Sequence, residues 1–380
     1  MSQPAEAPDG GSLPVTLFLC GDVMTGRGID QILPHPSAPQ LFEPYVRSAL
    51  EYVELAERAS GPIARPADFA YVWGDALAEL GRVRPDGRIV NLETAVTTSD
   101  AALLDKGIHY RMSPANVPCL SAAALDCCVL ANNHVLDWGR AGLAETLATL
   151  RQAGLRSAGA GADEREAAAP AVIGLSAKGR VLVFAAATED SGVPPRWAAG
   201  GARPGVNLLR DLSARGVQTV ARQVAAHKRS GDLALMSLHW GGNWDYEIGA
   251  AQRGFAHGLI DDAGIDVVHG HSSHHVKGVE VYRGRPILYG CGDFLTDYEG
   301  IGGYEAYRPD LGLMYFPTLD AASGRLLRFA ATPTRTRRFR IERAGGAEAR
   351  WLRDTLSREG KALGTRAELR PDDTLSLIWN

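Results

Sequence analysis

The chain lacks the features that would tie it to a membrane or to nucleic acid. No stretch of its 380 residues has the roughly 18 consecutive apolar residues that a membrane-spanning helix needs. Its formal net charge of −4 also provides no excess of basic side chains with which to bind a polyanion. We therefore expect a protein with neither a membrane nor a nucleic acid as its partner.

Cysteine is scarce, and a recognisable secretory signal is missing. The five cysteines lie in apolar runs without CxxC spacing, at Cys20, Cys119, Cys127, Cys128 and Cys291. An odd number of such residues predicts buried free thiols in a reducing compartment. Residues 1–13 have neither the basic beginning nor the apolar middle of a signal peptide, and we expect a short disordered leader there. These features together predict a cytoplasmic protein.

Short apolar runs alternate with segments of helical periodicity along the chain. Five runs have the composition of buried strands, at 15–20, 87–92, 126–131, 233–238 and 264–270. Three segments have the amphipathic pattern of helices, at 139–154, 208–230 and 252–264. Strands that alternate with helices are typical of layered α/β folds, in which helices cover β-sheets. We therefore predict the α/β class.

Most of the chain is predicted to form one domain, residues 14–345. Within it, residues 26–86 contain two proline-rich breaks around a helical segment, which indicates an insertion after the first strand. Residues 346–380 are predicted to form a helix and a strand that pack on this domain.

Each of the five predicted strands ends in polar residues that can bind a metal or carry a proton. These residues are Asp22, Glu93, Asn133, His134, His239, His271 and His274. In open α/β sheets, binding sites form just beyond the carboxyl ends of the strands, where several loops converge. Turn chemistry explains one polar strand end but not five, so we predict a shared site.

The densest group of polar residues is the stretch HGHSSHHVKG at 269–278. Histidine is the commonest protein metal ligand and titrates near neutrality, so the stretch suits metal binding or proton transfer. His269 lies on the apolar strand itself and is expected to be a core histidine with satisfied hydrogen bonds. His275 is expected to point away from His274 if the strand stays extended, which leaves its role open.

Five motifs follow one another in a distinctive order: GDVMTGRG, NLETAV, NNHVLDWG, HWGGNWDYE and HGHSSHHVKGVEVYRGRPILYGCGDF. In this order and spacing, between about residues 15 and 320, the chain resembles the CapA family, which is named for poly-γ-glutamate capsule synthesis. That family belongs to the calcineurin-like metallophosphatase superfamily. The resemblance implies a layered fold of β-sheets flanked by helices for residues 14–345, with a divalent metal beyond the strand ends.

The resemblance also assigns roles to single residues. The metal ligands that it implies are Asp22, Glu93, Asn133, His239 and His274. His134 matches the superfamily histidine that acts as an acid near the reacting group, and Asp137 follows at a distance that lets it orient His134.

Two positions depart from the superfamily pattern. The first motif of the superfamily is Asp-x-His, whereas Met24 stands at the histidine position after Asp22 here. The first histidine of the later GHxH motif falls on Ser272, and placing His271 there requires a shift of one residue. The loss of two imidazoles predicts a single divalent ion bound mostly by oxygen, a ligand set that suits Ca²⁺, Mn²⁺ or Mg²⁺.

Histidines that are not used as ligands become available for proton transfer. A carboxylate on one ring nitrogen fixes the tautomer of a histidine and raises the basicity of the other nitrogen. The carboxylate of Asp293, in the segment CGDF, is a candidate for this role. The predicted catalytic residues are His134, Asp137, His271, His275 and Asp293.

Among soluble CapA-like proteins, the chain is similar in kind to the lasso-peptide epimerase that inverts a C-terminal tryptophan. This resemblance implies a metal-dependent peptide epimerase, an isomerase of ribosomal peptide biosynthesis with a precursor peptide as its partner and Ca²⁺ as its preferred ion. The alternative is a metal-dependent phosphoesterase or a γ-glutamyl amide hydrolase or ligase of the CapA type. A non-catalytic metal-dependent binding protein is a third hypothesis, which His134 with Asp137 argues against because a binding protein needs no positioned acid.

Overall fold

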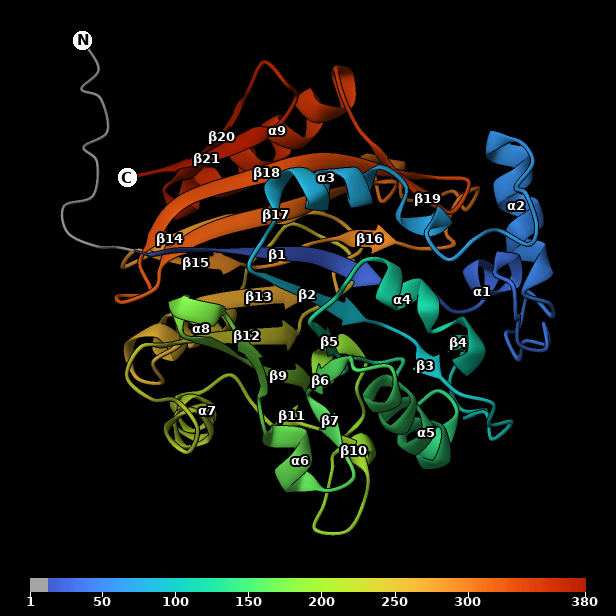
Figure 1. Cartoon of the computed structure of the whole chain (residues 1–380), viewed down its shortest axis with the longest axis horizontal. Helices are drawn as coiled ribbons and strands as arrows, with labels where there is room; N and C mark the ends of the chain where they lie inside the picture. Colours follow the sequence, from blue (N-terminus) through green and yellow to red (C-terminus); the bar gives the residue numbers. More distant parts are fainter. Residues whose placement is uncertain (1–12) are drawn as a thin grey trace.

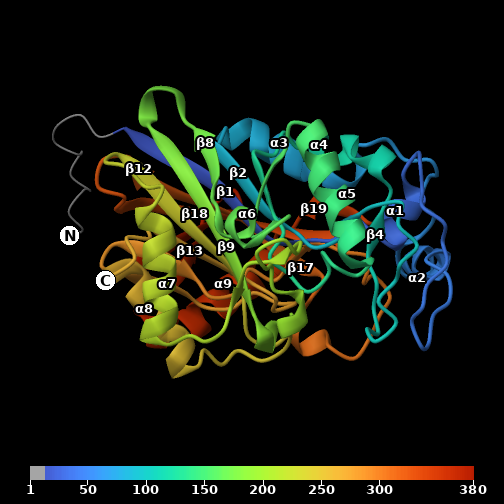
Figure 2. The same cartoon turned by 90° about the horizontal axis from the view of Figure 1, so that it is seen from below.

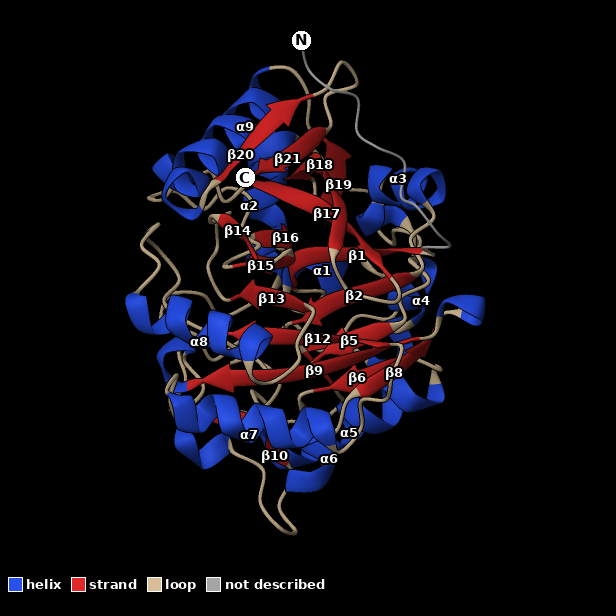
Figure 3. Cartoon of the chain, turned by 90° about the vertical axis from the view of Figure 1, so that its left-hand side faces the viewer, coloured by secondary structure: helices blue, strands red, loops and turns tan. Residues whose placement is uncertain are grey.

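The structure is a computed structural model that describes residues 13–380. The predicted leader, residues 1–13, lies outside the described residues except for Leu13. Two large β-sheets pack against each other at the centre of the described residues, and helices cover them from outside (Figure 1, Figure 3). The predicted α/β class, with β-sheets flanked by helices, is confirmed.

The first sheet has ten strands in the order β20-β21-β18-β17-β1-β2-β5-β6, with β16 paired to β1 and β19 paired to β18. Strands β1, β2, β5 and β6 are parallel, and β16 is also parallel to β1, whereas β17, β18, β21 and β20 follow one another in antiparallel pairs. The bounds are β1 Pro14–Val23, β2 Gly87–Leu92, β5 Cys127–Val129, β6 Arg156–Ala158, β16 Asp293–Leu295, β17 Leu311–Asp320, β18 Leu326–Arg337, β19 Arg340–Arg343, β20 Thr365–Leu369 and β21 Leu375–Trp379.

The second sheet has seven strands in the order β11-β9-β12-β13-β15-β14, with β8 paired to β9. Its central strands β9, β12 and β13 are parallel. The bounds are β8 Ala171–Gly174, β9 Arg180–Thr188, β11 Leu208–Leu209, β12 Asp232–His239, β13 Val267–His271, β14 Val279–Tyr282 and β15 Arg285–Leu288. Two short pairs complete the strands, β3 Ala95–Val96 with β4 Arg111–Met112, and β7 Ala160–Gly161 with β10 Gly205–Val206.

The helices lie on the outer faces of the sheets. Helices α7 and α8 lie side by side against the second sheet (Figure 2), where valines 217, 220 and 224 give α7 its apolar stripe. Helix α9 packs on β20, and α1 and α2 lie in the segment between β1 and β2. The bounds are α1 Gly28–Ile32, α2 Leu50–Ser60, α3 Asp75–Val83, α4 Pro118–Ala122, α5 Gly139–Gln152, α6 Glu164–Ala168, α7 Ala214–Ala225, α8 Ala250–Asp261 and α9 Ala347–Gly360.

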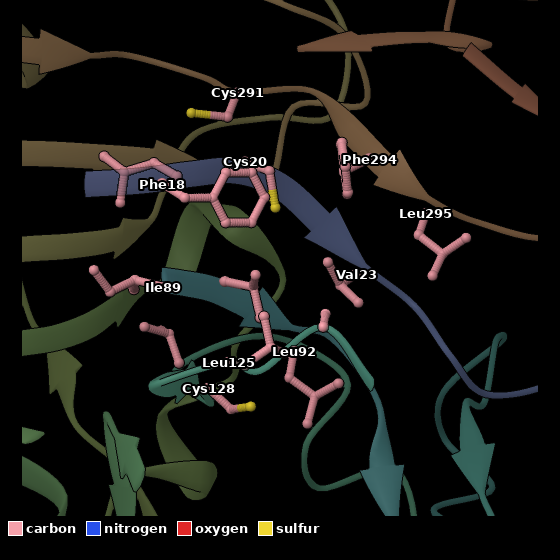
Figure 4. Close-up of a cluster of buried hydrophobic side chains, with 14 of the residues drawn as sticks. Phe18, Cys20, Val23, Ile89, Leu92, Leu125, Cys128, Cys291, Phe294 and Leu295 are labelled. Atoms are coloured by element: carbon pink, nitrogen blue, oxygen red, sulfur yellow. The ribbon is translucent and has the colours of Figure 1, made fainter. Parts of the chain in front are cut away.

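The largest hydrophobic core surrounds β1. Both faces of this strand are buried, which explains why its sequence is a nearly continuous apolar run. Figure 4 shows Phe18 and Cys20 of β1 near Ile89 of β2 and Phe294 of β16. A fully buried side chain of this size contributes about 1.5–3 kcal/mol of transfer free energy, so the core holds the carboxyl end of β1 in a fixed position.

The register of the strands brings the polar strand ends together. Asp22 on β1 is paired with Asn91 on β2 and, on the other side, with Asp293 on β16. In the second sheet, His239 on β12 is paired with His271 on β13. Figure 1 shows β1 and β2 pointing toward the end of the molecule that carries α1, α2 and α4. The predicted convergence of strand ends is therefore present in both sheets.

Several details of the structure refine the predicted elements. The run 87–92 forms β2 without any change of bounds. The predicted helix 208–230 begins only at Ala214, because Leu208–Leu209 pairs with β9 as a short strand and Ser213 caps the helix. All five cysteines are buried and free, as predicted. Within residues 13–380, none of the helices is both long enough and apolar enough to cross a bilayer.

Gly21 is required for the close approach of β1 and the segment before β16. A Cβ atom at this position would overlap the carbonyl oxygen of Gly292, which accepts a hydrogen bond from the Asp22 amide at 3.0 Å. We expect Gly21→Ala to lower the free energy of unfolding by about 1–3 kcal/mol, the usual cost of overpacking. Urea denaturation measures this loss.

Gly174→Ala is the matched control, because a Cβ there meets nothing within 4 Å. This substitution in β8 should leave the free energy of unfolding unchanged or slightly raised. Equal stability of the two variants would contradict the close packing of β1 against Gly292.

Candidate metal centre and acid–base site

Two groups of potential metal ligands share the carboxylate of Asp22. One group is Asp22, His239 and His271, and the other is Asp22, His274 and Asp293. Within each group the ligand atoms lie within 4.8 Å of one another. The Nδ1 atoms of His239 and His271 are only 2.8 Å apart. The strand register aligns Asp22 with Asp293 in the first sheet and His239 with His271 in the second, and the packing of the two sheets brings these strand ends together. His274 follows the end of β13.

Glu93 joins the first group from the end of β2. Its Oε2 atom lies 3.8 Å from Nδ1 of His239. The amide nitrogen of Asn91 donates hydrogen bonds of 2.8 Å to both Asp22 Oδ1 and Glu93 Oε2. Asn132 in turn donates to Asn91 Oδ1 at 3.0 Å, so a buried amide pair fixes the two carboxylates.

The electrostatics of this group indicate that a cation belongs between its carboxylates. Burial, together with the nearby charge of Asp293, raises the pKa of Asp22 to about 7. Burial and the charge of Asp22 raise the pKa of Glu93 well above its usual range. Asp22 Oδ2 and Asp293 Oδ2 are buried and have no hydrogen-bond partner among the described residues. Uncompensated buried carboxylates are costly, and a divalent ion would offset this cost.

The two histidines of the first group are in the form that binds metal. Burial lowers the pKa of His239 and of His271 well below the usual range, so both imidazoles are neutral at pH 7. Nε2 of His271 lies 2.9 Å from Ser237 Oγ, which fixes the ring and leaves Nδ1 facing His239. Neutral imidazole with one nitrogen held by a partner is the usual arrangement of a metal ligand.

The donor atoms fit a divalent transition-metal ion better than Ca²⁺. His271 lies in the cluster, whereas Ser272 donates to the carbonyl of Gly241, so the register shifted by one residue is the one that the structure supports. Only the imidazole replaced by Met24 is then missing. Two imidazoles beside a carboxylate suit Mn²⁺, Fe²⁺ or Zn²⁺, whereas Ca²⁺ prefers oxygen ligands. The prediction of a mainly oxygen-bound ion assumed that His271 is not a ligand, and the position of His271 in the first group removes that premise.

An acid–base pair stands at the edge of the cluster. Nδ1 of His134 lies 2.7 Å from Asp137 Oδ2, and Nε2 of His134 faces Glu93 Oε1 at 3.9 Å. Lys106 forms an ion pair with Asp137 and also contacts the carbonyl of Asn133. The Tyr110 amide donates to Asp137 Oδ2 at 2.7 Å, so the carboxylate that orients His134 is itself fixed.

The charges around the pair keep its two members in complementary states. Burial and the charge of Lys106 lower the pKa of His134 to about 4, so its imidazole is neutral at pH 7. Burial alone would raise the pKa of Asp137, but Lys106 and His134 hold it below the usual range. A neutral imidazole backed by a carboxylate is suited to accept a proton and to return it.

A second histidine–carboxylate pair lies on the other side of Asp22. Nδ1 of His274 is 2.9 Å from Asp293 Oδ1. Burial acts to lower the pKa of His274, but the carboxylates of Asp293 and Asp22 raise it above the usual value. His274 is therefore suited either to bind a metal or to exchange protons.

His275 is placed differently from the other predicted catalytic residues, whereas Asn133 stays a predicted ligand. His275 contacts Trp244, Tyr246 and Tyr307 in an aromatic cluster. Strand β13 ends at His271, so His274 and His275 lie in a bend, and His274 contacts Trp244 as well. Among the described residues, His275 belongs to neither ligand group. Asn133 Oδ1 is buried without a partner, and the side chain adjoins Gly192. His269 is a satisfied core histidine as predicted, bonded to Ser237 and to the carbonyl of Cys20.

Comparison with known proteins supports the capsule-synthesis resemblance. The family model "Bacterial capsule synthesis protein PGA_cap" matches residues 16–298. The chain is 50% identical over 365 residues to a "Probable polyglutamine synthesis accessory protein" of Mycobacterium tuberculosis, with 96% of each chain covered. It is 28% identical to the "PGA biosynthesis protein CapA" of Bacillus subtilis, over 73% of this chain and 62% of that protein.

Among solved structures, the chain is similar to one titled as a novel phosphatase from Mycoplasma pneumoniae, with a TM-score of 0.45 and 10% identity over 85% of this chain and 94% of that one. This likeness does not bear on activity. The fold and the clustered ligands define an α/β protein with a candidate divalent-metal centre. The match to the family model then shows that the chain belongs to the PGA_cap family of CapA-like proteins. None of the relatives named here is described as an epimerase.

Proposed function

We propose that this protein is a metal-dependent hydrolase of γ-glutamyl amide bonds. The observation that carries the proposal is the position of His134, which is held by Asp137 and faces Glu93 at the edge of the candidate metal centre. The substrate class is suggested by the relatives, whose names refer to the synthesis of polyglutamate and polyglutamine. Amide hydrolysis needs a proton acceptor for water and a proton donor for the leaving amine, and one histidine can serve as both.

The candidate ligands for the ion are Asp22, Glu93, His239 and His271, with His274 and Asp293 adjoining them. A divalent ion, when bound, supplies Lewis-acid polarisation of a carbonyl group. In the hydrolysis, a water molecule attacks the amide carbon and His134 Nε2 accepts its proton. The carbon–nitrogen bond then breaks, and His134 returns the proton to the leaving nitrogen. Asp137 keeps the imidazole in the required tautomer throughout.

The test is a pair of activity assays on the purified protein with Mn²⁺ added. We expect a γ-glutamyl amide to release one new primary amine per bond cleaved, with no phosphate released from a phosphate monoester. Release of phosphate without amide cleavage would favour the phosphoesterase alternative. Failure of both reactions across Mn²⁺, Fe²⁺ and Zn²⁺ would reject a hydrolytic role.

A specific observation also favours peptide epimerisation as a second candidate. The site contains two histidine–carboxylate pairs, His134 with Asp137 and His274 with Asp293. Inversion at a Cα atom needs one group to remove a proton and another to deliver one from the opposite face. In D₂O, this reaction would place one deuterium at the inverted Cα of an intact peptide. Amide cleavage without deuterium at Cα would exclude it.

Lys106 is expected to be a positioning residue for His134 and Asp137. Lys106→Met keeps the length of the side chain but removes the charge that binds Asp137. Loss of such a supporting partner usually costs about 10–100-fold in activity. We expect this fall in kcat at an unchanged KM and metal content, measured by steady-state kinetics and elemental analysis.

Lys178→Met is the matched control, because Lys178 forms a similar ion pair with Asp86 outside the candidate site. It should leave kcat unchanged. If Lys106→Met behaves like the control, Lys106 does not position the acid–base pair.

A further inference from the structure

A cavity of about 690 Å³ opens beside the candidate metal centre. His274 is part of its wall and also belongs to the second ligand group, so the cavity is continuous with the site. This volume is within the range of about 300–1,000 Å³ that ligand pockets occupy. The cavity can therefore hold the part of a substrate that extends away from the reacting bond.

The wall of the cavity is mainly aromatic and aliphatic. Trp244 and Tyr304 are stacked with their ring centroids 3.8 Å apart. Tyr298 makes an edge-on contact with the ring of His274 at 5.4 Å. Tyr45, Ile301 and Tyr304 are 66%, 45% and 44% exposed and also belong to the wall, so apolar surface is open to a ligand. Flat apolar groups pack favourably against exposed rings of this kind.

The cations in the wall are already paired. Arg27 forms buried ion pairs with Asp297 and Glu43. Arg308 is paired with Asp310 by two hydrogen bonds of 2.7 Å.

The anions in the wall add no binding group for a carboxylate either. Glu299 accepts a hydrogen bond from the Phe339 amide at 3.3 Å through Oε2, whereas its Oε1 atom is buried and has no hydrogen-bond partner among the described residues. The wall therefore offers aromatic surface to a ligand, but neither guanidinium group is free to bind an additional carboxylate.

We infer that this cavity binds an apolar group on the amine side of the γ-glutamyl bond. The inference rests on the proposed function and narrows its substrate class to γ-glutamyl amides of aromatic or large aliphatic amines, including peptides with such a residue after the bond. A poly-γ-glutamate chain would instead bring one free carboxylate per residue into the cavity. Without a free cation, burying those carboxylates carries a large desolvation cost.

The experiment compares two substrates that differ only on the amine side, γ-glutamyl-2-naphthylamide and γ-glutamyl-glutamate. Binding is measured by calorimetry on the metal-loaded His134→Ala variant, so that turnover does not interfere, and cleavage is measured on the unmodified sequence. We expect the naphthylamide to bind more tightly and to have the higher kcat/KM. Tyr304→Ala should weaken its binding about three- to tenfold, the scale of one aromatic contact, without weakening that of γ-glutamyl-glutamate.

Two further variants sharpen the comparison. Ile301→Lys adds a cation at an exposed wall position and should shift the preference toward γ-glutamyl-glutamate. Tyr282→Ala removes a stacked ring that lies outside the cavity, against His257, and should change neither affinity.

Equal or tighter binding of γ-glutamyl-glutamate to the unsubstituted cavity would overturn the inference, even if both amides are cleaved. Tyr304-dependent binding of the naphthylamide without any cleavage would instead support the cavity assignment and reject the hydrolase. The two failures are therefore distinguishable.

Discussion

Asp22→Asn should abolish metal binding and activity while the protein remains folded. Asp22 is the one residue common to both ligand groups, and its Oδ2 atom is buried without a partner. The substitution keeps the size of the side chain but removes a negative charge from a cluster that also contains Glu93 and Asp293. The variant should therefore bind the ion at least 10–100-fold more weakly, roughly the loss seen for weaker supporting contacts. Elemental analysis after purification measures the bound ion directly.

Thermal unfolding separates this effect from a loss of folding. Addition of Mn²⁺ should raise the Tm of the unmodified protein, because a ligand that binds only the native state stabilises it. The Asp22→Asn variant should show no such rise. Without metal, it should be at least as stable as the unmodified protein, since one of several mutually repelling buried carboxylates is gone. A large fall in Tm that occurs with and without metal would make Asp22 a structural residue instead.

Asp30→Asn is the matched control, because Asp30 is also a buried aspartate but is bonded to Ser37, Ser113 and Asn116 outside the site. It should retain the metal-dependent rise in Tm. If the control also loses the rise in Tm, the loss in Asp22→Asn reflects the removal of any buried carboxylate and not the removal of a metal ligand.

The sequence predicts the central strands well because burial dictates their composition. A strand buried on both faces is mostly apolar, so the run 87–92 marks β2 with its bounds unchanged although it includes Arg88 and Asn91. The start of α7 is harder to predict, because the apolar pair Leu208–Leu209 suits a strand as well as a helix. Its pairing with β9 makes it a strand, and this pairing is not visible in the local sequence. The pairing of β16 with β1 joins residues far apart in the chain, and no local pattern encodes it.

The sequence also predicts part of the site. Polar residues at strand ends are visible in the sequence, and the packing of the two sheets brings Asp22 together with His239 and His271. The prediction that His275 points away from His274 assumed an extended strand, but β13 ends at His271 and both rings contact Trp244. A gapless alignment to the GHxH motif instead favours Ser272 over His271, because a shift of one residue is invisible without the backbone.

Two residues of the site, Asn91 and Lys106, are harder to predict from the sequence. Asn91 precedes Glu93 by two positions, so the alternation of a strand could have placed both on one face. Lys106 lies in an irregular segment, and its contact with Asp137 arises only from the folded path of the chain. Residues of this kind depend on tertiary structure, which neither periodicity nor motif spacing records.

His134→Gln should cut turnover by about 10²–10⁴-fold, the usual cost of losing a general acid or base. Glutamine keeps a polar side chain at this position but cannot accept a proton at Nε2 and return it. The metal content should stay the same, because the Nε2 atom is 3.9 Å from Glu93 and belongs to neither ligand group. The fall should appear in kcat, since the cavity that is proposed to bind the apolar group is formed by other residues.

His257→Gln is the matched control, because His257 also pairs with a carboxylate, Glu280 at 3.1 Å, but lies outside the candidate site. It should leave kcat unchanged. Asp137→Asn should reproduce much of the His134→Gln loss, because an amide no longer fixes the tautomer of the imidazole. The double variant should be little worse than His134→Gln alone, since residues that act as one unit are not additive. Additive losses would mean that Asp137 acts independently of His134, and full activity of His134→Gln would remove His134 from the mechanism.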